Sequence, residues 1–157
     1  MKKFNLKTRA LIPALVLIVT LGSCSKDKNP DQDKPKTKKD LIVRAWIQTD
    51  LIASVGGLSQ SVFDDEIEAC AQDNIFTLNS DGTFVLTENT VKCSANDIVT
   101  TGTWQLVEND TKVIIDPADE DPQTLTIEEL TETSFKGSLV DNSTGMEIKL
   151  VGVYQPK

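Results

Sequence analysis

The stretch IFTLNSDGTFVL, residues 75–86, decides the fold. Apolar residues recur at every second position on both sides of its centre, a pattern typical of β-strands. At the centre, the side chains of Asn79 and Asp81 can bond to the nearby backbone, and Gly82 tolerates a positive φ. The stretch therefore predicts an antiparallel hairpin, whose two strands we expect at Asn74–Leu78 and Thr83–Glu88.

The same alternation recurs along the rest of the chain from residue 40. In one example, Gly102, Trp104 and Leu106 share one strand face, while Thr103 and Gln105 share the other. One apolar and one polar face per strand is typical of antiparallel sheets. The pattern predicts six further strands, at Ala45–Ile52, Gly102–Val107, Lys112–Asp116, Thr124–Glu129, Phe135–Val140 and Met146–Tyr154.

Eight short strands joined by tight turns predict an all-β fold, a small antiparallel up-and-down barrel. Closing the sheet into a barrel removes its edges. The segment from residue 40 to 157 contains 35 Val, Ile, Leu or Phe residues, which is enough for a single core. A β-sandwich is the alternative, because periodicity alone does not separate the two architectures.

A short helix is predicted before the second strand. Ser61 can cap its start, and acids follow in the first turn, where the helix dipole favours them. Phe63, Ile67 and Cys70 have the spacing of one helical face. We interpret the acids at 64–68 as solvated helix charges and not as a cation site.

The N-terminal segment has the features of an export signal. A basic start is followed by the apolar run ALIPALVLIVTL, residues 10–21, which is too short to span a bilayer. The run ends in Leu21-Gly22-Ser23-Cys24, which resembles the bacterial lipobox. We therefore expect a lipoprotein signal peptide at 1–23 and lipidation of Cys24, whose acyl chains would anchor the protein to a membrane.

The segment that follows Cys24 predicts a tether. Residues 25–39 include no apolar side chain, so they cannot contribute to a core. We expect residues 24–39 to be a lipidated, disordered tether and residues 40–157 to be the barrel domain. Ser25 follows the cysteine where an aspartate would indicate retention in the inner membrane, so the outer membrane is favoured. The face of that membrane is left open.

The cysteines predict one disulfide. Assigning Cys24 to the lipid leaves Cys70 and Cys93 as a pair in an oxidising compartment. Residues paired in an antiparallel hairpin have a constant sum of residue numbers. The sum for Cys70 and Cys93 lies within two of the sum set by Asn79 and Gly82, so the two thiols should lie nearly opposite each other.

Composition excludes several classes of function. The chain has 24 acids, 16 bases and no histidine, with a formal net charge of −8. Histidine-dependent triads and metal sites are therefore excluded, and an acidic chain lacks the basic face that nucleic acids need. No nucleophile motif, phosphate-binding glycine loop or calcium-binding loop is present. We expect a protein that is not an enzyme, with no cofactor and no metal.

Several motifs together resemble a known family. They are the early Trp strand Arg44-Ala45-Trp46, the hairpin at 75–86, its flanking cysteines and the later Gly102-Thr103-Trp104. This order is similar to the bacterial lipocalin-like domain family of small outer-envelope lipoproteins, over roughly residues 41–154. The resemblance implies a small antiparallel barrel. It supports ligand transport less strongly, because the intact G-x-W lies in mid-chain and Ala45 stands where a glycine is common.

Two functions follow from a barrel of this size, which either holds a small ligand or is filled by its own side chains. The first is binding of a small apolar or amphipathic molecule. Gln48 and Asp50 share the face of Trp46 and would be its polar contacts, unless a bulge turns them to water. The second is an accessory protein that contacts an unidentified protein partner through the loops at 117–122 and 89–99. The residues expected to line a lumen are Trp46, Phe84, Trp104, Phe135, Ile148 and Leu150.

Overall fold

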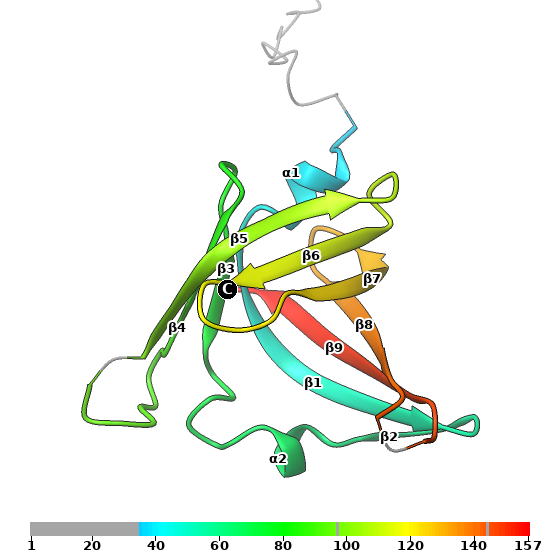
Figure 1. Cartoon of the computed structure of the whole chain (residues 1–157). Helices are drawn as coiled ribbons and strands as arrows, with labels where there is room; N and C mark the ends of the chain where they lie inside the picture. Colours follow the sequence, from blue (N-terminus) through cyan, green and yellow to red (C-terminus); the bar gives the residue numbers. More distant parts are fainter. Residues whose placement is uncertain (1–34, 97, 144) are drawn as a thin grey trace, which may run out of the picture. The chain divides into compact units, whose positions relative to one another are not determined.

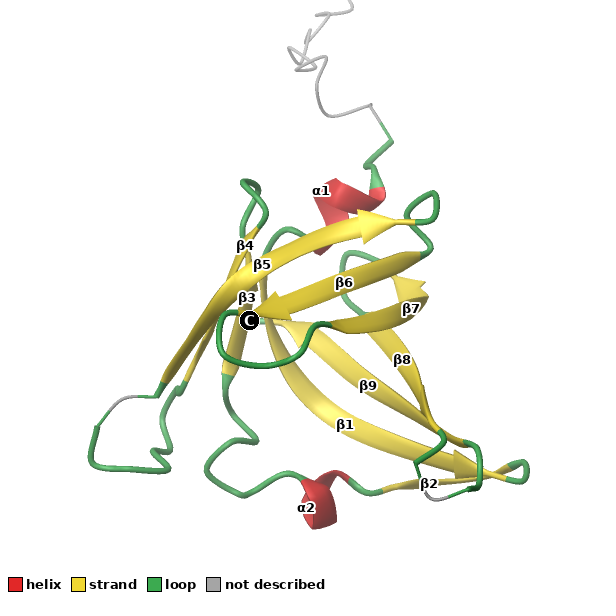
Figure 2. Ribbon diagram, in the orientation of Figure 1, coloured by secondary structure: helices red, strands yellow, loops and turns green. Residues whose placement is uncertain are grey.

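The computed structural model describes residues 35–96, 98–143 and 145–157 (Figure 1). The predicted signal peptide, Cys24 and the tether up to residue 34 lie outside the described residues. The fold is all-β, as predicted, with two short helices (Figure 2). The elements are α1 (Lys38–Ile42), β1 (Ala45–Val55), β2 (Leu58–Ser61), α2 (Phe63–Glu66), β3 (Ile75–Leu78), β4 (Thr83–Thr87), β5 (Val99–Val107), β6 (Lys112–Pro117), β7 (Gln123–Leu130), β8 (Phe135–Asp141) and β9 (Ile148–Pro156).

The sheet closes on itself. From β3 to β9 each strand pairs with the next one in sequence, and every pairing is antiparallel. β1 then pairs with β3 on one edge and with β9 on the other. The result is an eight-stranded up-and-down barrel, which excludes the sandwich alternative.

β2 is a ninth strand that the sequence did not predict. It pairs with the far end of β1, from Ile52 to Val55, through a tight turn at Gly56 and Gly57. β3 pairs with the near end of the same edge, from Ala45 to Ile47. β2 has the sequence LSQS, with a single apolar residue and all four side chains exposed, so it has no alternating pattern.

One end of the barrel is closed by α1. Thr37 and Asp40 form a capping box, in which the Thr37 hydroxyl accepts from the Asp40 N–H and the Asp40 carboxylate accepts from the Thr37 N–H. Lys38 donates to the Asp110 carbonyl in the β5–β6 turn, 2.9 Å away. The helix starts two residues before the predicted domain boundary, so Lys38 and Lys39 belong to the domain and not to the tether.

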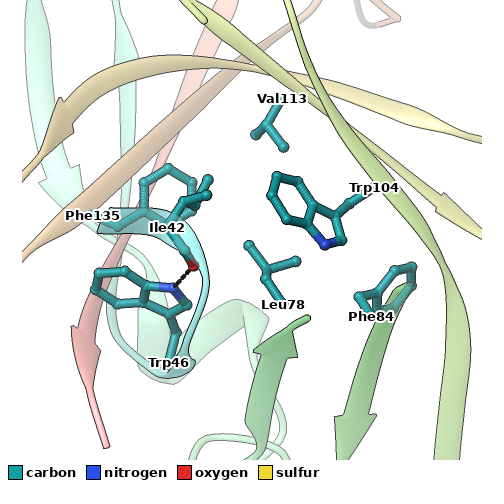
Figure 3. Close-up of a cluster of buried hydrophobic side chains, with 7 residues drawn as sticks. All are labelled: Ile42, Trp46, Leu78, Phe84, Trp104, Val113 and Phe135. Carbon is teal, nitrogen blue, oxygen red and sulfur yellow. Dashed lines mark hydrogen bonds between the residues drawn. The ribbon is translucent and has the colours of Figure 1, made fainter. Parts of the chain in front are cut away.

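The core lies directly under α1 (Figure 3). Trp46 is fully buried, and its indole N–H donates to the Ile42 carbonyl at 2.9 Å. Its ring packs against Phe135, with centroids 5.7 Å apart, and the Arg44 guanidinium lies over it. Trp104 is held in the same way, since its indole donates to the Asn79 carbonyl in the β3–β4 turn. Both tryptophans thus tie strands to the segments that close this end.

The glycine of the G-x-W motif is explained by a close approach. A Cβ at Gly102 would lie 2.1 Å from the Asp116 carbonyl oxygen and 2.6 Å from the Phe84 ring. No larger residue fits without displacing the β6 backbone. Gly102 therefore permits the close packing of β4, β5 and β6 around Phe84.

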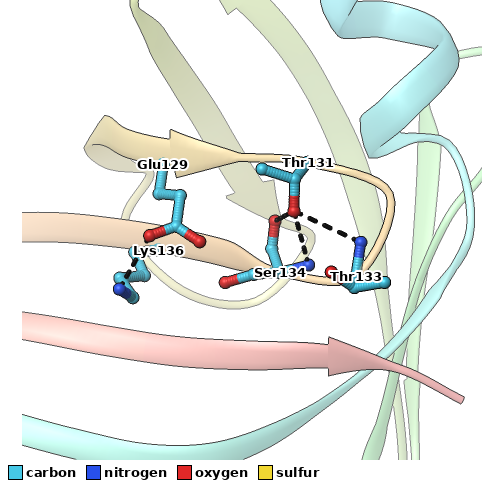
Figure 4. Close-up of polar contacts among 5 residues, drawn as sticks. All are labelled: Glu129, Thr131, Thr133, Ser134 and Lys136. Atoms are coloured by element: carbon cyan, nitrogen blue, oxygen red, sulfur yellow. Dashed lines mark hydrogen bonds and ion pairs between the residues drawn. The ribbon is translucent and has the colours of Figure 1, made fainter.

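The β7–β8 turn lies at the α1 end and is held by side chains (Figure 4). The Thr131 hydroxyl accepts from the backbone N–H groups of Thr133 and Ser134, at 3.2 and 3.0 Å. Lys136 forms an ion pair with Glu129 at 2.7 Å, and mainly this contact holds the pKa of the Glu129 carboxyl below its usual value. The turn is therefore ordered by local contacts.

The predicted helix after Ser61 is shorter than expected. α2 has four residues and ends at Glu66, so Phe63, Ile67 and Cys70 do not share a helical face. Ser61 is the last residue of β2, and the N-cap position of α2 is Val62. The Ser61 hydroxyl donates to the Asp50 carboxylate at 2.6 Å and accepts from the Phe63 N–H at 3.5 Å. Among the described residues, no helix has the length and apolar character needed to cross a membrane.

Replacing Trp46 tests whether the core closes the barrel as described. Trp46→Ala should lower the free energy of unfolding by about 3–5 kcal/mol, because it removes a large buried ring and leaves a cavity. Urea titration followed by circular dichroism measures this loss. The exposed Gln105 offers a control, since Gln105→Ala should change stability by no more than about 0.5 kcal/mol. A loss below about 1 kcal/mol for Trp46→Ala would show that Trp46 is not a core residue.

Candidate ligand-binding site

A cavity of about 300 Å³ lies in the barrel beyond the core. This volume is at the lower end of the range for small-molecule sites. Most of its walls are apolar, and none of the residues that line it is charged. The lining residues are Gln48, Ile67, Ala71, Asn74, Phe76, Leu86, Ile115, Gln123, Leu125 and Tyr154.

The cavity forms the next layer inside the barrel after the core. Inward-facing residues alternate along a strand, so two residues make one inward step. Gln48 lies one such step beyond the core residue Trp46, and Ile115 lies one step beyond Val113. The same step leads from the core residues of β3 and β4 to Phe76 and Leu86. The core thus fills the barrel at the α1 end, and the hollow part lies on the side away from α1.

The predicted lining residues occupy other places. Trp46, Phe84, Trp104 and Phe135 are buried in the core, and Ile148 and Leu150 are half-buried toward the start of β9. None of the six lines the cavity. The alternation identified the inward face correctly for all of them, but it carries no information about depth along the barrel.

Gln48 and Asp50 are separated by a β-bulge at Thr49. Gln48 pairs with Tyr154, whereas Asp50 pairs with the next residue back, Val153, so the two side chains point to opposite faces of β1. Gln48 therefore lines the cavity, where the sequence predicts a polar contact for a ligand. Asp50 does not, and its carboxylate accepts from the Ser61 hydroxyl and the Leu51 N–H instead.

The segment between α2 and β3 covers a gap in the barrel wall. Neither β2 nor β3 pairs with β1 between Ile47 and Ile52. The residues that follow α2 contribute Ile67, Ala71 and Asn74 to the cavity wall. We call residues 67–74 the cover segment. It was not predicted as part of the site, because the sequence predicts a short helix for Ile67 and Cys70 and the start of a strand at Asn74.

The predicted disulfide is present and holds the cover segment. Cys70 and Cys93 are bonded, with Cα atoms 5.0 Å apart. The two cysteines lie in loops beyond the paired residues of β3 and β4, so the bridge joins the cover segment to the β4–β5 loop. Glu68 lies close to both sulfur atoms, but a disulfide leaves no thiolate to bind a metal.

Two carboxylates also bind the β4–β5 loop. Asp73, in the cover segment, accepts from the backbone N–H groups of Thr90 and Val91, at 2.9 and 3.2 Å. The buried Glu88 accepts from the Cys93 and Ile98 N–H groups, at 2.7 and 3.2 Å. Acids that bind loop backbone have no recognisable spacing in the sequence, so neither role was predicted.

Comparison with known proteins agrees with this architecture. The model of the lipocalin-like domain family matches residues 42–137, most of the barrel. The chain belongs to this family. The resemblance seen in the sequence is thereby confirmed for the lipocalin-like domain.

Two solved structures that resemble the chain are distant from it in sequence. A lipocalin-like protein from Bacteroides uniformis is 11% identical over 74% of this chain and 98% of its own, with a TM-score of 0.48. Lobster apocrustacyanin A1 is 14% identical over 81% of this chain and 66% of its own, with a TM-score of 0.45. No curated protein matches the chain.

Removing the disulfide should destabilise the lipocalin-like domain. Cys70→Ser should lower the free energy of unfolding by about 3 kcal/mol, because the bridge links two cysteines that are 23 positions apart in the sequence and so restricts the unfolded chain. Cys93→Ser and the double variant should show the same loss, since each change breaks the same bond. Chemical denaturation without reductant measures all three. Losses that add up in the double variant would mean that the cysteines act independently.

Proposed function

We propose that this protein is a lipid-anchored protein of the cell envelope, and that its lipocalin-like barrel binds a small apolar or amphipathic molecule. The observation that supports binding is the hollow layer between the core and the cover segment. Its walls are mainly apolar with a few polar groups, which is the usual composition of a small-molecule site. A barrel filled along its whole length would not need a covered opening.

The proposed location depends on the sequence. The lipobox-like Leu21-Gly22-Ser23-Cys24 supports lipidation of Cys24, and Ser25 supports the outer membrane as the destination. The oxidised pair Cys70–Cys93 agrees with an exported protein, because disulfides persist in oxidising compartments.

A second candidate is an interaction protein that uses its loops. The β4–β5 loop exposes Val91 and Ile98, and Val99 follows as the first residue of β5; each has about half of its surface in contact with solvent. Apolar side chains gathered on one loop are typical of contact surfaces. This role is compatible with the first, because the loop and the cavity are different parts of the domain.

Lipidation is tested by Cys24→Ser. The variant should move from the membrane fraction to the aqueous fraction after cell lysis and washing, because it lacks the thiol that carries the lipid. Immunoblots of both fractions measure the distribution. Cys70→Ser is the matched control and should stay with the membrane. If Cys24→Ser remained membrane-bound after washing, lipidation at this site would be wrong.

Ligand binding is tested by filling the cavity. Ala71 lies in the cover segment and lines the cavity, so Ala71→Phe should occupy the space with little effect on the barrel. Native mass spectrometry of protein purified from its own cells should show a bound small molecule in the wild type and none in Ala71→Phe. The control is Ala95→Phe, on the exposed β4–β5 loop, which should keep the adduct. An adduct that survives in Ala71→Phe would place the ligand elsewhere.

A further inference from the structure

Three polar side chains form a row on one wall of the cavity. Gln48 on β1 pairs with Tyr154 on β9. On the other edge of β1, Ile47 pairs with Ile75, so Asn74 continues that register beside Gln48. All three line the cavity, and the opposite wall includes Ile115 and Leu125 on β6 and β7. Three of the four polar lining residues therefore lie at one level on one wall, and the fourth, Gln123, pairs with Ile115 on the opposite wall.

Some polar atoms of this row have no hydrogen-bond partner among the described residues. The Asn74 Oδ1 atom is buried and has no hydrogen-bond partner among the described residues. Gln48 uses its amide nitrogen to donate to the Asp50 carbonyl at 3.2 Å, so its Oε1 is the atom of this side chain that can accept from a ligand. A buried acceptor without a partner costs free energy, and a ligand that donates to it removes that cost.

Tyr154 supplies a donor in the same row. Its ring stacks on Phe135 in the core, with centroids 5.3 Å apart. The ring lies over Gly152, where a Cβ would come within 2.8 Å of the phenol oxygen. The absence of a side chain at position 152 thus leaves room for the Tyr154 ring and hydroxyl. Burial raises the pKa of this phenol, so it stays protonated and able to donate.

Charge is disfavoured throughout this site. None of the lining residues carries a charge, so a buried ionic group on a ligand would lack a counter-ion. The chain next to the lining residues is acidic, with α2 and Glu68 flanking Ile67, and acids at 119–121 just before Gln123. These acids repel anions in particular.

We infer that the cavity selects an uncharged amphipathic molecule whose polar end is a hydroxyl or amide group, able to donate to Asn74 and to accept from Tyr154. This inference rests on the proposed ligand-binding function and narrows it. The apolar part of the molecule lies against Phe76, Leu86 and Leu125. A carboxylate or an ammonium on the same apolar chain is rejected.

The test is a displacement assay on the full chain carrying Cys24→Ser, in buffer without detergent. The reporter is N-phenyl-1-naphthylamine, an uncharged dye that fluoresces in apolar sites, and Ala71→Phe identifies the signal that comes from the cavity. Four competitors share a similar chain: decan-1-ol, its isomer 1-methoxynonane, decanoate and decylammonium. The alcohol donates and accepts, the ether only accepts, and the other two are ions.

Decan-1-ol should compete best. The ether should bind about three- to tenfold more weakly, because it cannot donate to Asn74. Both ions should bind at least about tenfold more weakly than the alcohol, because an unpaired charge is desolvated. If either ion competes as well as decan-1-ol while the reporter still binds, the inference is overturned and the proposed function stands. If the reporter and all competitors fail to bind, both are overturned.

Two variants test whether the preference for the alcohol depends on the row formed by Gln48, Asn74 and Tyr154. Asn74→Leu should abolish the difference between alcohol and ether, and Tyr154→Phe should weaken both by a similar factor. Asn142→Leu, on the exposed β8–β9 turn, is the control and should change neither. Thermal melts show whether each variant is folded, and Tyr154→Phe loses only one oxygen atom. Unchanged selectivity in a folded Asn74→Leu would overturn the role of this wall.

Discussion

The closure of the sheet depends on β1, whose eleven residues pair with three other strands. One edge of β1 is occupied by β9 along most of its length. The other edge is divided between β3 and β2, which pair with opposite ends of the strand. Because neither reaches the middle of β1, the chain between them crosses the gap as the cover segment. The gap in the barrel wall and the segment that covers it therefore both result from the unpaired middle of β1.

The two halves of the barrel are packed differently. Under α1, two tryptophans and Phe135 fill the lumen, and both indole N–H groups have backbone partners. Large rings bury much apolar surface in a small domain, so this half can supply most of the stability. The other half has smaller or polar inward side chains and leaves a cavity. A stable core beside a hollow layer lets the domain keep a cavity without depending on its contents to fold.

The surroundings of the cavity combine an acidic surface with an uncharged interior. The domain from residue 40 has 21 acids and 6 bases, yet none of the residues that line the cavity is ionisable at neutral pH. Asp73, in the cover segment, and Glu88, after β4, both bind backbone N–H groups of the β4–β5 loop. Charged groups thus hold this loop, whereas the polar groups that line the cavity are amides and one phenol.

The sequence by itself determined the strand periods, the inward faces, the hairpin at 75–86 and the pairing of Cys70 with Cys93, because these are local or depend on parity along a strand. Only the tertiary structure decided which inward residues fill the core and which line a cavity, since that depends on the stagger of neighbouring strands. It also decided the opposite directions of Gln48 and Asp50, because a bulge changes the parity without any signal in the residues. The role of the cover segment also follows from the tertiary structure, because it depends on the middle of β1 being left unpaired by both β2 and β3.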